Sequence, residues 1–133
     1  MQVSGIDHVN IITDDLDGTV AFYGQVLGLE RRDSPGVAMG FKGAWLCDAA
    51  GNAIVHLMWN DPERELGAGH VPGDKTAAVH HVAFRCAGFD AAKARLDGMG
   101  MEYRVNDRQF GDLRQIFVTD PNNIALELNF AGD

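Results

Sequence analysis

Cysteines and basic residues are both scarce in this chain of 133 residues, which has two cysteines and 11 lysines and arginines. Cys47 and Cys86 are isolated and lack metal-type spacing, so we expect reduced thiols and no disulfide framework. The 19 acidic residues give a formal net charge of -8. That charge argues against nucleic acid or an anionic membrane surface as a partner, because both require basic patches.

Long apolar runs are also missing. No segment approaches the ~20 apolar residues of a membrane-spanning helix, and Met1 is followed by neither the basic nor the apolar stretch of a secretory signal. We therefore expect a cytoplasmic protein. The chain has no G-x-S-x-G motif, no phosphate-binding glycine loop and no H-E-x-x-H motif, which removes three common kinds of active site.

What the chain does contain is an internal repeat. His56 lies 48 residues beyond His8, and Glu127 lies 46 residues beyond His81, so each pair opens and closes a unit of nearly equal length. The flanking residues also match: Asp7-His8-Val9-Asn10-Ile11 against His80-His81-Val82-Ala83-Phe84, and Ile54-Val55-His56-Leu57-Met58 against Leu126-Glu127-Leu128-Asn129.

Apolar periodicity predicts the same order of elements in both halves. In the first half we expect a strand over 3–13 and an amphipathic helix that begins after Thr13-Asp14-Asp15 and ends at Gly28. Further strands are expected near 29–33, 37–42, 44–48 and 53–59. In the second half we expect a strand over 79–86, a helix over 89–99 ended by Gly100, and strands near 101–105, 112–119 and 124–130.

The segment 60–76 is rich in glycine, proline and charge and is the predicted linker. The expected organisation is a single domain over 1–133, with module one at 1–59 and module two at 77–133. Each module has the order βαβββ, which makes the fold class α+β.

Alternation of side chains along a strand sorts the repeated residues by face. His8 and Asn10 share one face, as do His81 and Arg85, and the more polar face of each strand carries its candidate ligand. If the modules turn these faces toward each other, they enclose a cleft. Imidazoles and a carboxylate are ligands of first-row divalent metals. We therefore predict one ion of Zn, Ni, Co, Fe or Mn, bound by the following residues: His8, His56, His81 and Glu127.

Arginines are the candidates for holding an anionic substrate group, because a guanidinium binds carboxylate or phosphate through two parallel bonds. Arg85 is the first candidate and Arg114 the second, ahead of Arg104 and Arg108; the alternative for either of the first two is a surface ion pair. Asn10 is a candidate substrate contact or a support for a metal ligand.

Aromatic residues and the two other histidines have plainer interpretations. The large aromatics can line a pocket, although such side chains more often belong to the core: Trp45, Trp59 and Phe110. His80 is expected to face away from His81, and His70 lies in the linker.

Longer motifs extend these observations. The stretch Val20-Ala21-Phe22-Tyr23-Gly24-Gln25-Val26-Leu27-Gly28-Leu29 follows the first histidine motif, and Phe117-Val118-Thr119-Asp120-Pro121-Asn122-Asn123-Ile124-Ala125-Leu126-Glu127-Leu128 closes the second half. With them, essentially the whole chain resembles the vicinal oxygen chelate superfamily, which includes glyoxalase I, methylmalonyl-CoA epimerase, fosfomycin-resistance proteins and extradiol dioxygenases.

The resemblance implies paired βαβββ modules that form a cupped mixed sheet around a divalent metal, and commonly a homodimer. His8, His81 and Glu127 match the family's usual ligands. His56 departs from the pattern, since glyoxalase-like enzymes tend to have Glu there and epimerases often Gln. The chain looks most like a glyoxalase-like subgroup.

Three functions follow as hypotheses. The first is a metal-dependent lyase or isomerase of the glyoxalase–epimerase type, which chelates neighbouring oxygens of a small carbonyl substrate, with Glu127 as the base that removes an adjacent proton. The second is an extradiol-type dioxygenase with an iron triad of His8, His81 and Glu127. The third is a non-catalytic small-molecule binding or resistance protein. We expect a homodimer whose metal site lies within one chain or is shared across two.

Overall fold

The computed structural model describes residues 1–64 and 69–132, with the backbone alone at 108–110. It divides into two compact units, Met1–Pro72 and Gly73–Asp133. The boundary falls within the predicted linker at 60–76, of which 65–68 lie outside the described residues. Each unit has one strand, one helix and three further strands in chain order. The predicted α+β fold of two βαβββ modules is confirmed.

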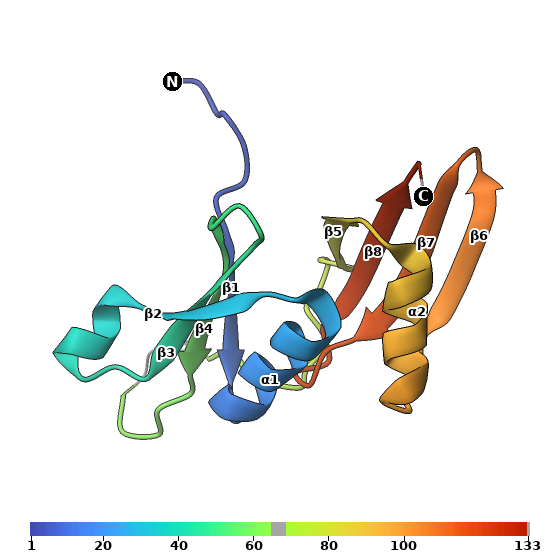
Figure 1. Ribbon diagram of the computed structural model, residues 1–133. Helices are drawn as coiled ribbons and strands as arrows, with labels where there is room; N and C mark the ends of the chain where they lie inside the picture. The colour runs from blue at the N-terminus through green and yellow to red at the C-terminus, as the bar shows by residue number, and fades with distance from the viewer. Residues whose placement is uncertain (65–68, 133) are drawn as a thin grey trace. The chain divides into compact units, whose positions relative to one another are not determined.

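The first unit forms a four-stranded mixed sheet in the order β1-β4-β3-β2 (Figure 1). Its elements are β1 (Val9–Thr13), α1 (Leu16–Leu27), β2 (Glu30–Asp33), the 3-10 helix η1 (Pro35–Met39), β3 (Gly43–Cys47) and β4 (Ala53–Trp59). β1 and β4 are parallel, and the other pairs are antiparallel. The carboxylate of Asp15 accepts the N–H of Gly18 at 2.9 Å, and Gly28 ends α1 at φ 70°, as predicted.

The second unit repeats this arrangement, with sheet order β5-β8-β7-β6 and β5 parallel to β8. Its elements are β5 (Val82–Cys86), α2 (Phe89–Gly98), β6 (Arg104–Phe110), β7 (Leu113–Thr119) and β8 (Ala125–Ala131). Figure 1 shows one helix beside each sheet. No helix of residues 1–64 and 69–132 has both the length and the apolarity to cross a membrane.

Each unit buries one face of its sheet and leaves the other more polar. In the first, α1 contributes Phe22, Tyr23 and Val26 to a core that also contains Val55 and Leu57. In the second, the buried apolar set includes the following residues: Phe89, Leu96, Ile116, Val118, Leu126, Leu128 and Phe130. Burial of these side chains is the main favourable term in folding. The opposite faces remain available for chemistry.

The predicted strand at 37–42 is wrong. Pro35 starts the 3-10 helix η1 there, and Gly40 ends it in the left-handed conformation at φ 81°. Proline presets the first helical turn, and glycine adopts a positive φ at little cost. Because β2 hydrogen-bonds directly to β3, the sheet has no position for a strand between them.

Other boundaries move by a few residues. The first strands of the units begin at Val9 and Val82 instead of 3 and 79, because the ladders with β4 and β8 begin there. The strand expected at 101–105 is β6 at 104–110, where the ladder with β7 forms. The helix expected over 89–99 ends at Gly98, with Gly100 two residues later at φ 63°.

Candidate functional site

The internal repeat extends to the register of the strands. Asn10 pairs with His56 across β1 and β4, and Ala83 pairs with Glu127 across β5 and β8. His8 and His81 each lie two residues before these pairs and directly before their strands. By alternation, each histidine shares the face of the residue that closes its unit. Each unit therefore carries two of the four candidate ligands on the face away from its helix.

In the first unit, the candidate imidazoles lie against an indole. The His8 ring is edge-on to both neighbours, with ring centroids 6.1 Å from His56 and 4.8 Å from Trp45. Trp45 stacks on His56 at 4.4 Å with an interplanar angle of 24°. Burial and the charge of His8 lower the pKa of His56. A lowered pKa favours the neutral ring, which is the form that binds metal.

Polar groups support both of these histidines. The amide nitrogen of Asn10 lies 2.9 Å from Nδ1 of His56 and 3.0 Å from the sulfur of Met58. A carboxylate oxygen of Asp7 lies 2.7 Å from Nδ1 of His8, which leaves Nε2 of that ring free to face a ligand. A carboxylate or amide behind an imidazole is the usual way in which proteins orient a metal-binding histidine.

In the second unit, two amides hydrogen-bond Glu127 and a third supports one of them. Its Oε1 accepts hydrogen bonds from Gln115 Nε2 at 3.0 Å and Asn129 Nδ2 at 2.8 Å. Gln115 also donates to Asn129 Oδ1 at 2.9 Å and accepts from Asn106 Nδ2 at 2.7 Å. The other carboxylate oxygen, Oε2, lies 3.3 Å from Nε2 of His81. The network therefore fixes the carboxylate with one oxygen toward the candidate histidine.

The donor atoms of the second unit fit a first-row divalent ion. Metal–nitrogen and metal–oxygen bonds are about 2.0–2.2 Å, so two ligands at right angles on one ion are separated by about 3 Å. The distance between Nε2 of His81 and Oε2 of Glu127 is 3.3 Å. Within residues 1–64 and 69–132, no three His, Cys, Asp or Glu side chains form a single cluster that could hold a metal ion.

Two residues of this face were not singled out from the sequence, and a third was expected to point elsewhere. Gln115 and Asn106 are 7% and 8% exposed; a glutamine within the apolar run of β7 was the available signal, because glutamine is seldom buried without a partner. His80 was expected to face away. Its Nδ1 instead lies 2.9 Å from Nδ1 of His81, with the rings edge to face at 5.2 Å.

Arg85 and Arg114 lie on opposite faces of the second sheet. Arg85 pairs with Asn129, so it lies on the Glu127 face, and its side chain is exposed. Arg114 pairs with Phe130, which places it on the helix-covered face. There its guanidinium lies 3.6 Å from the ring centroid of Phe89. Arg114 is thus not brought to Glu127.

Instead of a substrate contact, Arg114 makes the ion pairs expected as the alternative, at 3.1 Å to Asp90 and 3.2 Å to Asp107. The side chains of Arg108 and Phe110 lie outside the described part of the chain. Trp59 shares the core-side face of β4, where the ammonium of Lys42 lies 4.3 Å from its ring centroid. These contacts give Arg114 and Trp59 structural roles.

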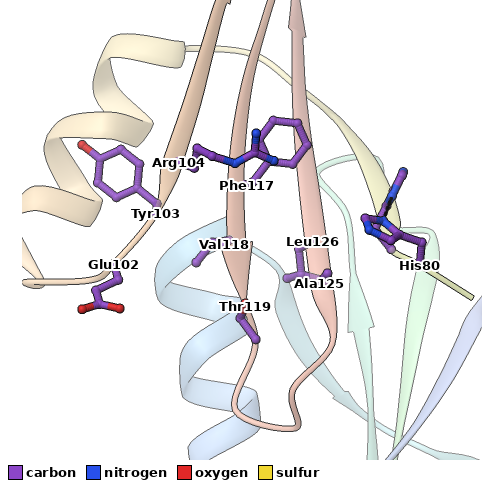
Figure 2. A pocket seen from close by; sticks show the side chains of 10 residues that line it. His80, Glu102, Tyr103, Arg104, Phe117, Val118, Thr119, Ala125 and Leu126 are labelled. Atoms are coloured by element: carbon purple, nitrogen blue, oxygen red, sulfur yellow. Dashed lines mark hydrogen bonds between the residues drawn. The ribbon is translucent and has the colours of Figure 1, made fainter. Parts of the chain in front are cut away.

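Each unit also has a hollow beside its candidate ligands. That of the second unit, about 400 Å³, is lined by polar and apolar side chains that include His80, His81 and Arg104. Figure 2 shows the Arg104 guanidinium beside the Phe117 ring, at 4.4 Å from its centroid. The hollow of the first unit, about 410 Å³, is lined mainly by apolar groups next to His56.

The chain belongs to the Glyoxalase/Bleomycin resistance protein/Dioxygenase superfamily, whose model matches residues 5–128. This confirms the resemblance read from the motifs. The Arabidopsis thaliana protein "Glyoxylase I 4" is 25% identical over 135 residues, which cover 96% of this chain and 71% of that protein.

Two solved structures share the fold. A glyoxalase family protein from Bacillus anthracis is 23% identical with a TM-score of 0.73, over 98% of each chain. A glutamate-to-glutamine variant of the fosfomycin resistance protein FosX from Listeria monocytogenes is 24% identical with a TM-score of 0.70, over 99% of this chain and 95% of that one. That variant was crystallised with Mn(II) and 1S,2S-dihydroxypropylphosphonic acid.

Proposed function

We propose that the protein is a metal-dependent lyase or isomerase of the glyoxalase–epimerase type, with one divalent ion held by His8, His56, His81 and Glu127. The observation that carries this proposal is the pairing of His81 with Glu127. The carboxylate of Glu127 is oriented by two amides, and its second oxygen lies 3.3 Å from the imidazole. The binding of Mn(II) by FosX supports a divalent metal in this fold.

The neighbours of the first pair of ligands also suit metal binding. Amide nitrogen and oxygen are interchangeable by a half-turn of the side chain. With its oxygen toward His56, Asn10 would accept the proton on Nδ1, and Nε2 would keep a lone pair for the ion. The low pKa of His56 acts in the same direction, because a neutral imidazole binds metal without first losing a proton.

The chemistry assigns distinct roles to the side chains. When bound, the ion would coordinate neighbouring oxygens of a small carbonyl substrate and lower the cost of removing the adjacent proton. Glu127 accepts that proton as general base. Since Oε1 is occupied by the amide hydrogen bonds of Gln115 and Asn129, Oε2 is the atom that receives it, and this oxygen would have to leave the ion transiently to do so. Arg85 binds a substrate carboxylate or phosphate, and Asn10 contacts the substrate or orients His56.

The assembly proposed is a homodimer, with the ligand-bearing faces closed on each other within one chain or between two chains. Mixing His8→Ala protein with His81→Ala protein separates the two arrangements. A shared site predicts that mixed dimers regain one intact site of two, whereas a site within one chain predicts no recovery. A monomer by light scattering at micromolar concentration would reject the dimer.

A substrate screen tests the reaction class. Metal-loaded protein is offered α-oxo thioesters, hemithioacetals and catechols while oxygen consumption is recorded. We expect turnover of a substrate with an acidic carbon–hydrogen bond, without oxygen uptake. Oxygen consumption with a catechol would replace the proposal by the dioxygenase, and tight binding without turnover would replace it by a binding protein.

A further inference from the structure

The hollow of the first unit differs in kind from a site for a charged group. Its volume of about 410 Å³ falls within the range of small-molecule sites. Its main side-chain walls are Pro35, Phe41, Trp45 and Met58, with His56 beside them. Lys42 also lines it, but the Lys42 ammonium lies over the ring of Trp59, on the other face of β4. The hollow therefore offers carbon and sulfur surfaces next to a candidate metal ligand.

The walls of this hollow are held in place by their own contacts. Trp45 stacks on His56, and the Arg64 guanidinium lies 4.7 Å from the ring centroid of Phe41. Gly36 of η1 lies beside the Phe41 side chain: a Cβ there would be in ordinary van der Waals contact, 3.4 Å from Phe41 Cβ and 3.5 Å from its ring. A preformed wall binds a ligand at a lower entropic cost than one that must be ordered on binding.

We propose that this hollow binds an aromatic ring of the substrate, so that the substrate class is an aryl-bearing compound with two neighbouring oxygens. The inference rests on the proposed function, because those oxygens would bind the ion held in part by His56. Trp45 and Phe41 offer the faces and edges that aromatic rings prefer, and the Met58 thioether suits contact with a ring. An anionic group would be desolvated there without a partner.

Two hydroxamates test the preference for a ring. Benzohydroxamate and acetohydroxamate present the same pair of chelating oxygens and differ in a phenyl against a methyl group. With metal-loaded protein, we expect benzohydroxamate to bind about 10- to 100-fold more tightly, from the additional apolar area removed from water. Equal affinities, measured by calorimetry, would overturn the inference and leave the metal site intact.

Variants at Phe41 test whether the preference for benzohydroxamate arises in this hollow. This half-buried residue lies outside the proposed ligand set. Phe41→Asp should reduce the benzohydroxamate preference to less than about threefold by placing a carboxylate against the ring, while Phe41→Leu should keep most of it. Trp59→Phe is the matched control on the other face of β4 and should leave the preference unchanged. A preference that survives Phe41→Asp in folded protein would contradict the assignment.

A binding experiment on metal-free protein distinguishes failure of this inference from failure of the proposed function. The chain has two tryptophans, so Trp59→Phe makes Trp45 the one fluorescent indole. In chelator-treated Trp59→Phe protein, millimolar benzohydroxamate should change the Trp45 emission, whereas acetohydroxamate should not. That response in a protein that binds no metal would reject the proposed function and retain the ring site. Absence of the response would reject the ring site whatever the metal content.

Discussion

The two units have the same topology and equivalent strand registers, yet they support their candidate ligands differently. Trp45 pairs with His56 in the first unit, and Phe117 pairs with Glu127 in the second, so an aromatic residue neighbours the closing ligand in both. Beyond that pair the chemistry diverges. His56 is stacked on an indole and contacts one amide, whereas Glu127 accepts two amide hydrogen bonds.

This difference follows from the chemistry of the two candidate ligands, an imidazole and a carboxylate. A part-buried carboxylate carries a full charge and requires hydrogen-bond donors, while a neutral imidazole is satisfied by one polar partner and tolerates an apolar surrounding. The first unit can therefore surround its candidate ligand His56 with Trp45, Phe41 and Met58 and leave an apolar hollow. The second unit instead holds Glu127 in a network of polar side chains. The two halves of the internal repeat thus share their strand register while the surroundings of His56 and Glu127 differ.

The largest expected effect separates base from ligand. Glu127→Gln should lower kcat by about 10²–10⁴-fold, since a general base typically contributes that factor. His56→Gln should weaken metal binding but keep kcat within about tenfold of wild type at saturating metal. Neither the imidazole nor the glutamine amide at this position takes a proton from the substrate. Steady-state kinetics at saturating metal check both variants. Equal losses of kcat in the two variants would contradict the assignment of Glu127 as base and His56 as ligand only.

The supporting amides provide the next contrast. Gln115→Leu should weaken metal binding by about 10- to 100-fold, as loss of a group that orients a ligand does elsewhere, because Asn106 and Glu127 both lose a partner. Asn10→Leu should cost about tenfold or less, since Asn10 is exposed and supports one ring nitrogen. Competition with a chromophoric chelator measures both affinities. A larger loss for Asn10→Leu would reverse the comparison.

Metal should also stabilise the native chain by mass action. At a free-ion concentration 100-fold above Kd, the stabilisation is about 2.7 kcal/mol, which corresponds to a rise in Tm of about 10 °C for a chain of this length. Scanning calorimetry with and without chelator should show this shift in wild type and lose most of it in His8→Ala and His81→Ala. A melting curve unaffected by chelator would indicate that these histidines are structural.

The smallest expected effects distinguish two arginines of the second unit. Arg85→Leu should raise KM for an anionic substrate by about tenfold, from loss of one charge-assisted contact. Arg114→Leu should leave KM within about twofold and lower the free energy of unfolding by about 1 kcal/mol, from its contacts with Phe89 and Asp90. Kinetics and urea unfolding resolve the pair. A KM effect confined to Arg114→Leu would contradict the assignment by face.

Much of the fold could be predicted because its signals are local. Apolar periodicity and caps at Asp15 and Gly28 predicted α1, and alternation along β4 and β8 predicted which residues share a face. The stretch 37–42 misled because its apolar residues suit a strand, while Pro35 and Gly40 enforce a 3-10 helix. Whether a strand forms there also depends on the direct pairing of β2 with β3.

The polar network was harder to predict. Gln115 reaches Glu127 only because the registers of β6, β7 and β8 align Asn106, Gln115 and Asn129 across three strands. Such registers are set by tertiary packing and are not encoded by spacing within one strand. Arg114 shows the same limit. Its charge was visible in the sequence, whereas the face it occupies follows from its pairing with Phe130.

Metal analysis of protein purified without an affinity tag tests the central claim most directly, namely that two dissimilar halves contribute ligands to one ion. Wild-type protein should carry about one divalent ion per chain. His8→Ala from the first unit and His81→Ala from the second should each lose most of that ion, because each removes a direct ligand. Full occupancy in both variants would contradict the account.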